Sequence, residues 1–168
     1  LADAQHHSRA RDGDGPGDEL GLRTALAAMR VVGTPPALSG PPLVVDIAPR
    51  LSQAVEPGTP TGLIGAFAEL VPDTTGHVVT ADRPELPELS GPGGEGRPLV
   101  LVVHDAWRHP WVRDLLARAV TLRPDAIVVE TGVPGEPTGA VYVTTNGISR
   151  ASARAVAHWL TTDPEGAH

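Results

Sequence analysis

The feature that most constrains the fold of this chain is a β-branched apolar run that is followed by an amphipathic helical pattern and then by a second β-branched apolar run. Residues 99–103 read Leu-Val-Leu-Val-Val, which is typical of a strand buried on both faces of a parallel sheet. Pro110 then stands where a first helical turn tolerates proline, and apolar side chains repeat at helical spacing until Pro124. A further apolar run, 126–129, completes a strand–helix–strand unit, whose crossover we expect to be right-handed.

The same alternation extends on both sides of this unit. It predicts helices from Asp18 to Val31, over 63–71 and from a Ser149 cap to about residue 160, and strands over 43–47, 77–80 and 141–143. The link before the last strand has about nine residues, fewer than a parallel crossover usually needs, so that strand is either antiparallel or joined by a tight crossing without a helix. The fold class is α/β: a layered sandwich with a mostly parallel sheet of about five strands flanked by helices.

The length of 168 residues fits one domain with tails. Residues 1–17 are polar and glycine-rich and predict a disordered linker, in which the doublet His6-His7 is not a metal site. We expect the α/β domain to span 18–162 and a short tail to follow at 163–168. Since the chain starts at Leu1 and shows no signal peptide, we expect a fragment of a longer protein, and the compartment stays open.

Composition excludes several classes of function. The chain has no cysteine, so disulfides and thiolate metal sites are excluded. A formal charge of −7 argues against a nucleic-acid partner, which requires a basic face. No apolar run approaches the roughly 20 residues that cross a bilayer, so we expect no membrane partner. We also expect no cofactor and no bound metal.

Candidate binding residues follow the ends of the strands, where open α/β sheets bind ligands. They are His104, Asp105, His109, Glu130 and Asn146. Two histidines and a carboxylate within six residues suit acid–base chemistry or metal binding, but this one short loop does not place them, or any further protein ligand, at a recognisable metal-binding spacing. Asn146 precedes the last helix, whose N-terminus can hold an anion, although a left-handed turn leading into the Ser149 cap explains it equally well.

A structural role competes with chemistry at these positions. We expect Asp105 and His109 to hold the turn and cap the helix that follows, and Glu130 to pair with an arginine or face another domain. A retaining glycosidase needs two carboxyl groups about 5 Å apart. Asp46 and Asp105 are the plausible strand-end companions for Glu130, and no spacing links them to it.

The remaining suggestive residues have simpler explanations. The glycines between 91 and 96 precede a strand instead of following one, so they predict loop flexibility and no phosphate loop. Among the tryptophans, Trp111 and Trp159 are expected in the core, while Trp107 is a candidate surface platform for a partner.

Several segments, taken in order, resemble the C-terminal domain of actinobacterial family 3 glycoside hydrolases of the β-N-acetylhexosaminidase type. Residues 104–111 read His-Asp-Ala-Trp-Arg-His-Pro-Trp, similar to the family's run "R-D-A-x-R-H-P-W". The resemblance spans roughly residues 19–161 and also includes the segments 19–31, 42–46, 123–132 and 145–150. The chain departs from the family at His104, where arginine is usual, and at 55–58, which matches a family loop only loosely.

The resemblance implies retaining hydrolysis of terminal N-acetylglucosamine-type sugars by a barrel that carries the nucleophilic aspartate and an Asp-His acid/base pair. No segment here matches the barrel's K-H-F-P-G-H-G-like motif, so no catalytic residue is transferred to this chain. The implied partners are the N-terminal catalytic barrel of the same polypeptide and, through it, a carbohydrate substrate.

Three hypotheses follow. The first is an accessory domain of such a hydrolase, inactive alone, with an exposed apolar patch on the first helix and the strand-end loops. The second is a stand-alone module that binds a small polar ligand such as a sugar in a cavity near His104, Asp105, Glu130 and Asn146. The third is a complete small enzyme, which requires two of those groups within hydrogen-bond reach and a strongly perturbed pKa.

Overall fold

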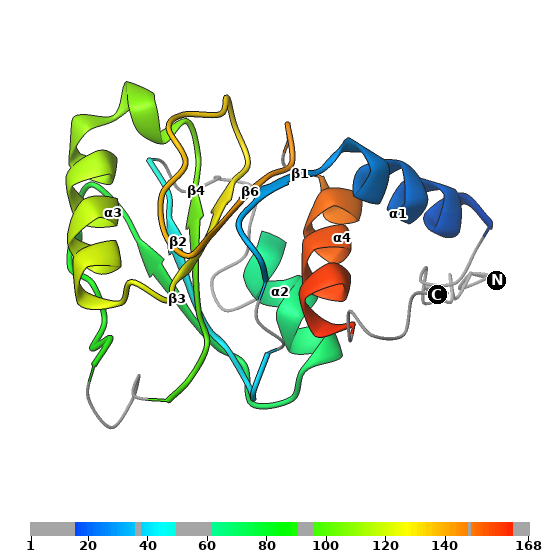
Figure 1. Cartoon of the computed structure of the whole chain (residues 1–168), viewed down its shortest axis with the longest axis horizontal. Helices are drawn as coiled ribbons and strands as arrows, with labels where there is room; N and C mark the ends of the chain where they lie inside the picture. Colours follow the sequence, from blue (N-terminus) through cyan, green and yellow to red (C-terminus); the bar gives the residue numbers. More distant parts are fainter. Residues whose placement is uncertain (1–15, 36–37, 50–61, 91–95, 148, 163–168) are drawn as a thin grey trace, which may run out of the picture.

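The computed structural model of the chain is an α/β sandwich built on one six-stranded sheet (Figure 1). It describes residues 16–35, 38–49, 62–90, 96–147 and 149–162. The helices are α1 (Pro16–Ala28), α2 (Gly62–Leu70), α3 (Pro110–Leu122) and α4 (Arg150–Thr161), with a short 3-10 turn η1 (Ala106–Arg108). The strands are β1 (Arg30–Val32), β2 (Leu43–Ile47), β3 (Thr75–Val79), β4 (Leu99–Val103), β5 (Ile127–Glu130) and β6 (Val141–Thr144).

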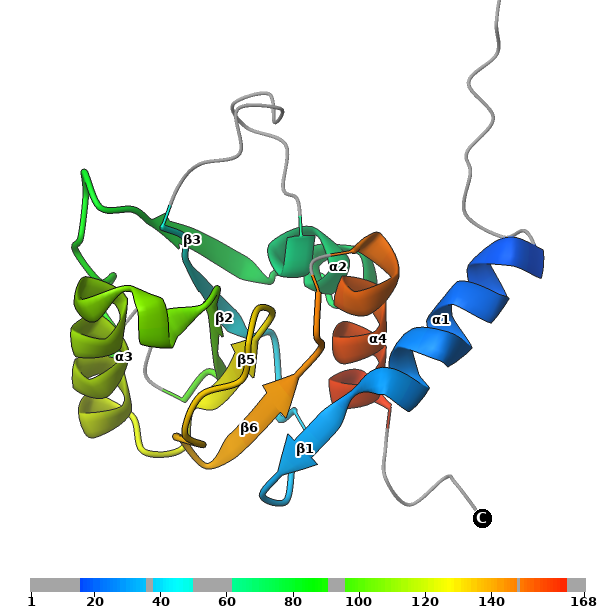
Figure 2. The same ribbon diagram turned by 90° about the horizontal axis from the view of Figure 1, so that it is seen from above.

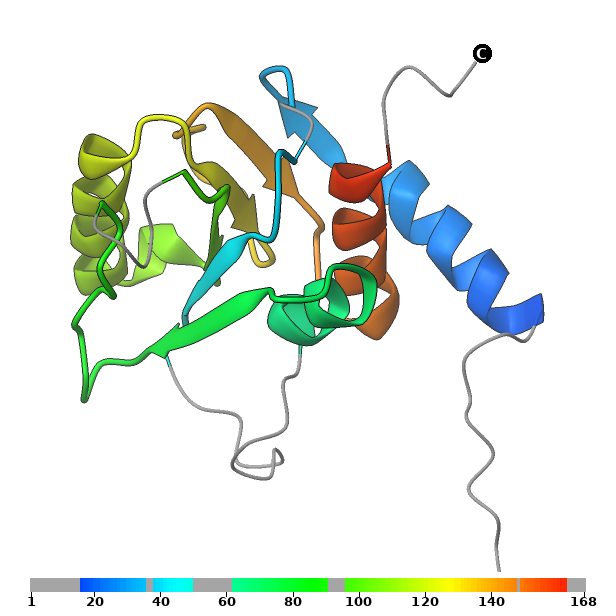
Figure 3. The same ribbon diagram turned by 90° about the horizontal axis from the view of Figure 1, so that it is seen from below.

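The strands lie in the order β1-β6-β5-β4-β2-β3, and every neighbouring pair except β1–β6 is parallel. The expected mostly parallel α/β sandwich is therefore confirmed, with one strand more than the sequence predicted. Helices cover both faces: α2 and α4 lie on one side of the sheet and α3 on the other (Figure 2). Helix α1 packs against the outer side of α4 (Figure 3).

The additional strand is β1, at one edge of the sheet. The sequence predicts helix as far as Val31, and this is wrong: α1 ends at Ala28, and Arg30–Val32 pairs antiparallel with β6. The β-branched pair Val31-Val32 suits a pleated strand better than a last helical turn, and the free edge of β6 supplies the partner. Gly33 ends β1 with φ 96°, and a Cβ there would collide with the carbonyl oxygen of Ala140.

The last strand, β6, is parallel to β5 and is reached without a helix. The link between them contacts the α3 face of the sheet, where Gly135 N–H donates to the hydroxyl of Tyr142 at 3.1 Å. At its far end Ala140 N–H donates to the carbonyl of Ala126 at 2.9 Å, and Gly139 takes φ 80°. Of the two alternatives that the sequence leaves open, the tight crossing is correct.

The sheet separates two apolar layers. On the α2/α4 face, alternate residues of β2, β4, β5 and β6 pack against helix residues that include the fully buried Phe67. On the α3 face, the other residues of these strands pack against α3 and against Leu89. Trp111 and Trp159 are partly buried against these layers, in agreement with their predicted core positions.

The helix ends show which capping predictions hold. Ser149 caps α4 as predicted, since its hydroxyl accepts from Ser152 N–H at 2.9 Å. Asp18 lies in the first turn of α1, which begins at Pro16, and its carboxylate is 3.7 Å from Arg154 of α4.

Some of the segments for which the sequence makes predictions lie outside the described residues: the doublet His6-His7, the loop 55–58 and Gly91, Gly93 and Gly94. None of the described helices is both long and apolar enough to cross a membrane.

Candidate functional site

The carboxyl ends of β2 and β4 form the point at which the chain changes sides. From β2 the chain passes to α2 on one face, and from β4 it passes to α3 on the other. The order of the strands also reverses here: β3 is added to the sheet on the far side of β2, and β5 is added on the far side of β4. In open α/β sheets, a crevice between two such strands is the usual place for a ligand. The polar side chains at this point are Asp46 of β2 and His104, directly after β4.

Asp46, His104 and Thr131 form a hydrogen-bonded row across three strand ends. The imidazole Nε2 of His104 lies 2.7 Å from Oδ1 of Asp46, and its Nδ1 lies 2.6 Å from the Thr131 hydroxyl. The Thr131 hydroxyl donates in turn to the carbonyl of Val103 at 3.3 Å. A doubly protonated imidazole satisfies all three contacts, because both ring nitrogens then donate. The side chains of His104 and Asp46 are 18% and 19% exposed, so the row is within reach of solvent.

The environment of His104 favours its charged form. Burial by itself lowers the pKa of His104, but the hydrogen bond to Asp46 and the negative charges of Asp46, Glu130 and Asp105 together raise this pKa above its ordinary value of 6.5. An Asp–His pair of this kind can hold or transfer a proton, and its remaining carboxylate oxygen can accept a hydrogen bond from a ligand.

This pKa shift predicts a specific pH dependence of stability. Because the folded-state pKa of His104 lies above the unfolded value, its contribution is fully present below about pH 6.5 and is lost as the pH rises through the folded-state pKa. Urea unfolding across this range is expected to show a pH-dependent component that His104→Gln removes. The exposed His77 provides the control, because His77→Gln should leave that component in place. An unchanged pH profile in His104→Gln contradicts the assignment.

Glu130 belongs to a separate network on the α3 side of the same edge. Its carboxylate is 1% exposed and accepts backbone N–H groups from Asp105 at 2.9 Å, Ala106 at 3.1 Å and Gly132 at 2.7 Å. The expectation that Glu130 pairs with an arginine or faces another domain is therefore wrong. Two loops meet around one buried carboxylate, both of whose oxygens accept backbone N–H groups and which burial keeps out of reach of a substrate.

Asp105 completes the connection between these two loops. Its backbone is left-handed, with φ 50°, and its Oδ1 accepts from Val133 N–H at 2.7 Å. Asp105 thus holds the turn as predicted, but it does so by bonding the opposite loop and not by capping a helix. A non-glycine residue in this conformation costs about 1 kcal/mol or more, which the surrounding hydrogen bonds must offset.

Gly132 is required where the two loops touch. A Cβ at this position would collide with Asp105 Oδ1 and lie 2.7 Å from the backbone nitrogen of Asp105. We expect Gly132→Ala to lower the free energy of unfolding by about 2–3 kcal/mol, as overpacking against fixed backbone does. Gly17→Ala in α1, where a Cβ meets nothing within 4 Å, is the matched control and should be neutral or slightly stabilising. Equal stabilities of the two variants in urea would contradict this close contact.

The other two predicted residues lie outside both networks. His109 occupies the N-cap position of α3, but its side chain makes no capping hydrogen bond, so that part of the prediction is wrong. Asn146 takes the expected left-handed conformation, with φ 55°, and its amide reaches the carbonyl of Ala28 at 3.5 Å. The structure thus pairs His104 with Asp46 and Thr131, joins Asp105 to Glu130, and leaves His109 and Asn146 apart.

The sequence reasoning missed Thr131 and the pairing of Asp46 with His104. The available signal was register: His104 and Thr131 each come one residue after the aligned pair Val103 and Glu130. Among the described residues, no group of three or more His, Cys, Asp or Glu side chains is arranged to hold a metal ion.

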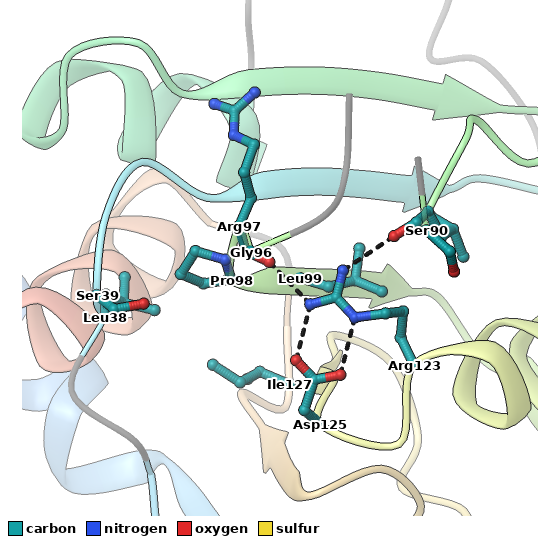
Figure 4. Close-up of a pocket in the computed structure, with 11 residues that line it drawn as sticks. Leu38, Ser39, Ser90, Gly96, Arg97, Pro98, Leu99, Arg123, Asp125 and Ile127 are labelled. Carbon is teal, nitrogen blue, oxygen red and sulfur yellow. Dashed lines mark hydrogen bonds and ion pairs between the residues drawn. The ribbon is translucent and has the colours of Figure 1, made fainter. Parts of the chain in front are cut away.

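A hollow of about 410 Å³ lies at the opposite, amino end of the strands (Figure 4). Arg123 crosses it, donating to both carboxylate oxygens of Asp125, at 2.8 and 2.7 Å, and to the carbonyls of Leu89 and Arg97, at 3.0 and 2.8 Å. The hydrogen bonds from Arg123 lower the pKa of Asp125 despite some burial. This guanidinium joins the loop before β4 to the turn before β5, so we assign it a structural role.

Comparison with solved structures identifies where this fold occurs. The structure of this chain matches that of a glycoside hydrolase family 3 β-N-acetylglucosaminidase from Paenibacillus sp. strain FPU-7, with a TM-score of 0.69 and 20% sequence identity. The match covers 96% of this chain and 33% of the Paenibacillus chain. The structure also matches a fungal multi-domain family 3 β-N-acetylglucosaminidase, described as having a GCN5-related glucosamine N-acetyltransferase region. In that case the TM-score is 0.59 and the identity 16%, over 83% of this chain and 17% of that one.

Neither a family model nor a curated protein sequence matches the chain. At these identities the structural likeness establishes the fold. The neighbours are family 3 β-N-acetylglucosaminidases, as the sequence resemblance predicted, and this chain spans about a third of the length of the Paenibacillus enzyme.

Proposed function

We propose that this chain is an accessory, C-terminal domain of a family 3 β-N-acetylglucosaminidase, and that another part of the polypeptide carries out hydrolysis. The observation that carries this proposal is the coverage of the fold match: nearly the whole chain, 96%, corresponds to only 33% of a longer enzyme. The fungal neighbour supports it, because there too the matched part is a fraction, 17%, of a multi-domain chain.

The chemistry of the carboxyl edge agrees with a supporting role. Retaining hydrolysis of a glycoside uses two carboxyl-type groups that flank the sugar. Glu130 is enclosed by backbone N–H groups, and Asp105 is bonded through Oδ1 to the opposite loop. Asp46 remains accessible, but it is paired with His104. These acids hold strand ends and loops together.

The test of this proposal is the substrate preference of the longer polypeptide that contains this chain in its source genome. We expect that polypeptide to hydrolyse a chromogenic N-acetyl-β-glucosaminide and to leave the matching β-glucoside nearly untouched. Turnover of the β-glucoside with no turnover of the N-acetylated substrate would place the protein outside this activity.

A second candidate function is a module that binds a small polar ligand between β2 and β4. It is favoured by the position of the Asp46–His104 pair between β2 and β4, the two strands after which the chain passes to opposite faces of the sheet. Both side chains are about one fifth exposed, and His104 orients the Asp46 carboxylate while leaving its second oxygen available. Titration with N-acetylglucosamine, followed by amide NMR shifts, tests it. Shifts at Asp46 and His104 that vanish in Asp46→Asn support this function, and an unchanged spectrum at millimolar sugar excludes it for that ligand.

A further inference from the structure

We propose that the two loops at the carboxyl edge, 104–109 and 131–135, form a preassembled docking surface for the catalytic domain of the same polypeptide. This inference rests on the proposed function and deepens it by naming the face through which the domain acts. We call this face the paired-loop surface. Its exposed members are Trp107, Arg108 and Val133.

The paired-loop surface is held rigid from within. Three backbone N–H groups converge on the buried Glu130 carboxylate, and a fourth, from Val133, reaches Asp105. The left-handed backbone of Asp105 is a strained feature that these bonds maintain, and such features gather at functional surfaces. Loops ordered before binding lose little conformational entropy when a partner docks, so rigidity at this place favours association.

Large apolar side chains are exposed on this rigid support. Trp107 is 46% exposed and Val133 49% exposed, one on each of the two joined loops. The two loops stay close together at Gly135, where an added Cβ would lie 3.9 Å from the Cβ of Trp107. The Arg108 guanidinium lies 4.9 Å from the centre of the Trp107 ring. Tryptophan and arginine are the side chains that most often dominate protein interfaces, and an apolar centre with a charged neighbour is the usual composition of such a patch.

The catalytic domain is the occupant that the comparisons favour. In both neighbours this fold is part of a longer chain, at 33% and 17% of the length, so in each it has further polypeptide to contact. The remaining exposed large apolar side chains of the described residues are Leu20, Val31, Val32, Leu70, Val78 and Leu122, which lie on helices or edge strands. None of these belongs to the two loops that Glu130 and Asp105 hold together.

Hydroxyl-radical footprinting with mass spectrometry tests the proposal on two proteins: this chain alone and the longer polypeptide. We expect the oxidation of Trp107 to fall about fivefold in the longer polypeptide, as its exposed fraction of 46% is enclosed, with Val133 protected in parallel. Leu122, which is 58% exposed at the end of α3, is the internal control and should be oxidised equally in both proteins. Trp107 oxidised equally in both proteins overturns the proposal.

Failure of this inference is distinguishable from failure of the proposed function. Hydrolysis of the N-acetyl-β-glucosaminide with Trp107 unprotected overturns the docking surface and leaves the accessory-domain proposal intact. Protection of Trp107 in a polypeptide without that activity overturns the catalytic domain as the occupant. Concentration-dependent protection of Trp107 in the isolated chain identifies a second copy as the occupant and also overturns the proposal.

Discussion

Replacement of Glu130 by glutamine is expected to lower the free energy of unfolding by about 3 kcal/mol, because charge-assisted hydrogen bonds to a buried carboxylate are worth about 1.5–3 kcal/mol each. Three backbone N–H groups converge on this side chain, which is 1% exposed. Glutamine keeps the size but has one oxygen in place of two, and its amide N–H groups face other donors. At least one buried N–H group therefore loses its acceptor. Urea unfolding monitored by circular dichroism measures the loss.

Glu136→Gln is the matched control for this variant. Glu136 lies on the same β5–β6 link but is exposed, so its replacement should change the free energy of unfolding by less than about 0.5 kcal/mol. The Glu130 variant should also weaken the left-handed turn at Asp105, and proteolysis within 104–109 is expected to accelerate. If Glu130→Gln is as stable as Glu136→Gln, the carboxylate does not organise the two loops.

Replacement of Arg123 by methionine is expected to lower the free energy of unfolding by about 2–4 kcal/mol. Methionine retains the apolar stem of the side chain, so the change isolates the guanidinium. The ion pair with Asp125 contributes less than about 1 kcal/mol of this loss, because Asp125 is 62% exposed and water screens the pair. A larger part comes from the carbonyls of Leu89 and Arg97, which lose a charged donor.

Arg118→Met controls for the loss of an arginine from the same helix region. Arg118 is exposed on α3, so its replacement is expected to have a small effect in the same urea experiment. Arg123→Lys is informative as well, since lysine keeps the charge but cannot reproduce the forked contact with Asp125 and the two carbonyls. Full stability of Arg123→Lys would indicate that charge alone suffices and would contradict the structural role assigned to the fork.

The fold was predictable from sequence because its strongest signals are local and repeated. The strand 99–103 and the helix after Pro110 follow from β-branched composition and helical periodicity, and both are confirmed. The errors occurred where partners distant in the sequence decide the outcome. Val31 continues an apolar helical pattern, yet its conformation is set by β6, more than 100 residues later. The direction of β6 was left open for a different reason: periodicity does not encode whether a link of about nine residues crosses to a parallel strand, as this one does.

The candidate site was predictable in place but not in its pairings. The strand-end rule predicted that His104, Asp105 and Glu130 lie at one edge of the sheet, and they do. Their partners could not be read from spacing, because Asp46 and His104 are 58 residues apart and Glu130 bonds backbone groups instead of side chains. Backbone N–H donors leave no mark in the sequence. A buried glutamate at a strand end is therefore assigned correctly only when the loop geometry is known.

The measurement that tests the central claim most directly is hydrolysis of a chromogenic N-acetyl-β-glucosaminide by this chain alone and by the longer polypeptide, at equal molar concentration. If the domain supports chemistry that is located elsewhere, the isolated chain shows only the background rate and the longer polypeptide turns the substrate over. Turnover by the isolated chain that is abolished in His104→Gln would contradict the account and assign the reaction to the Asp46–His104 pair.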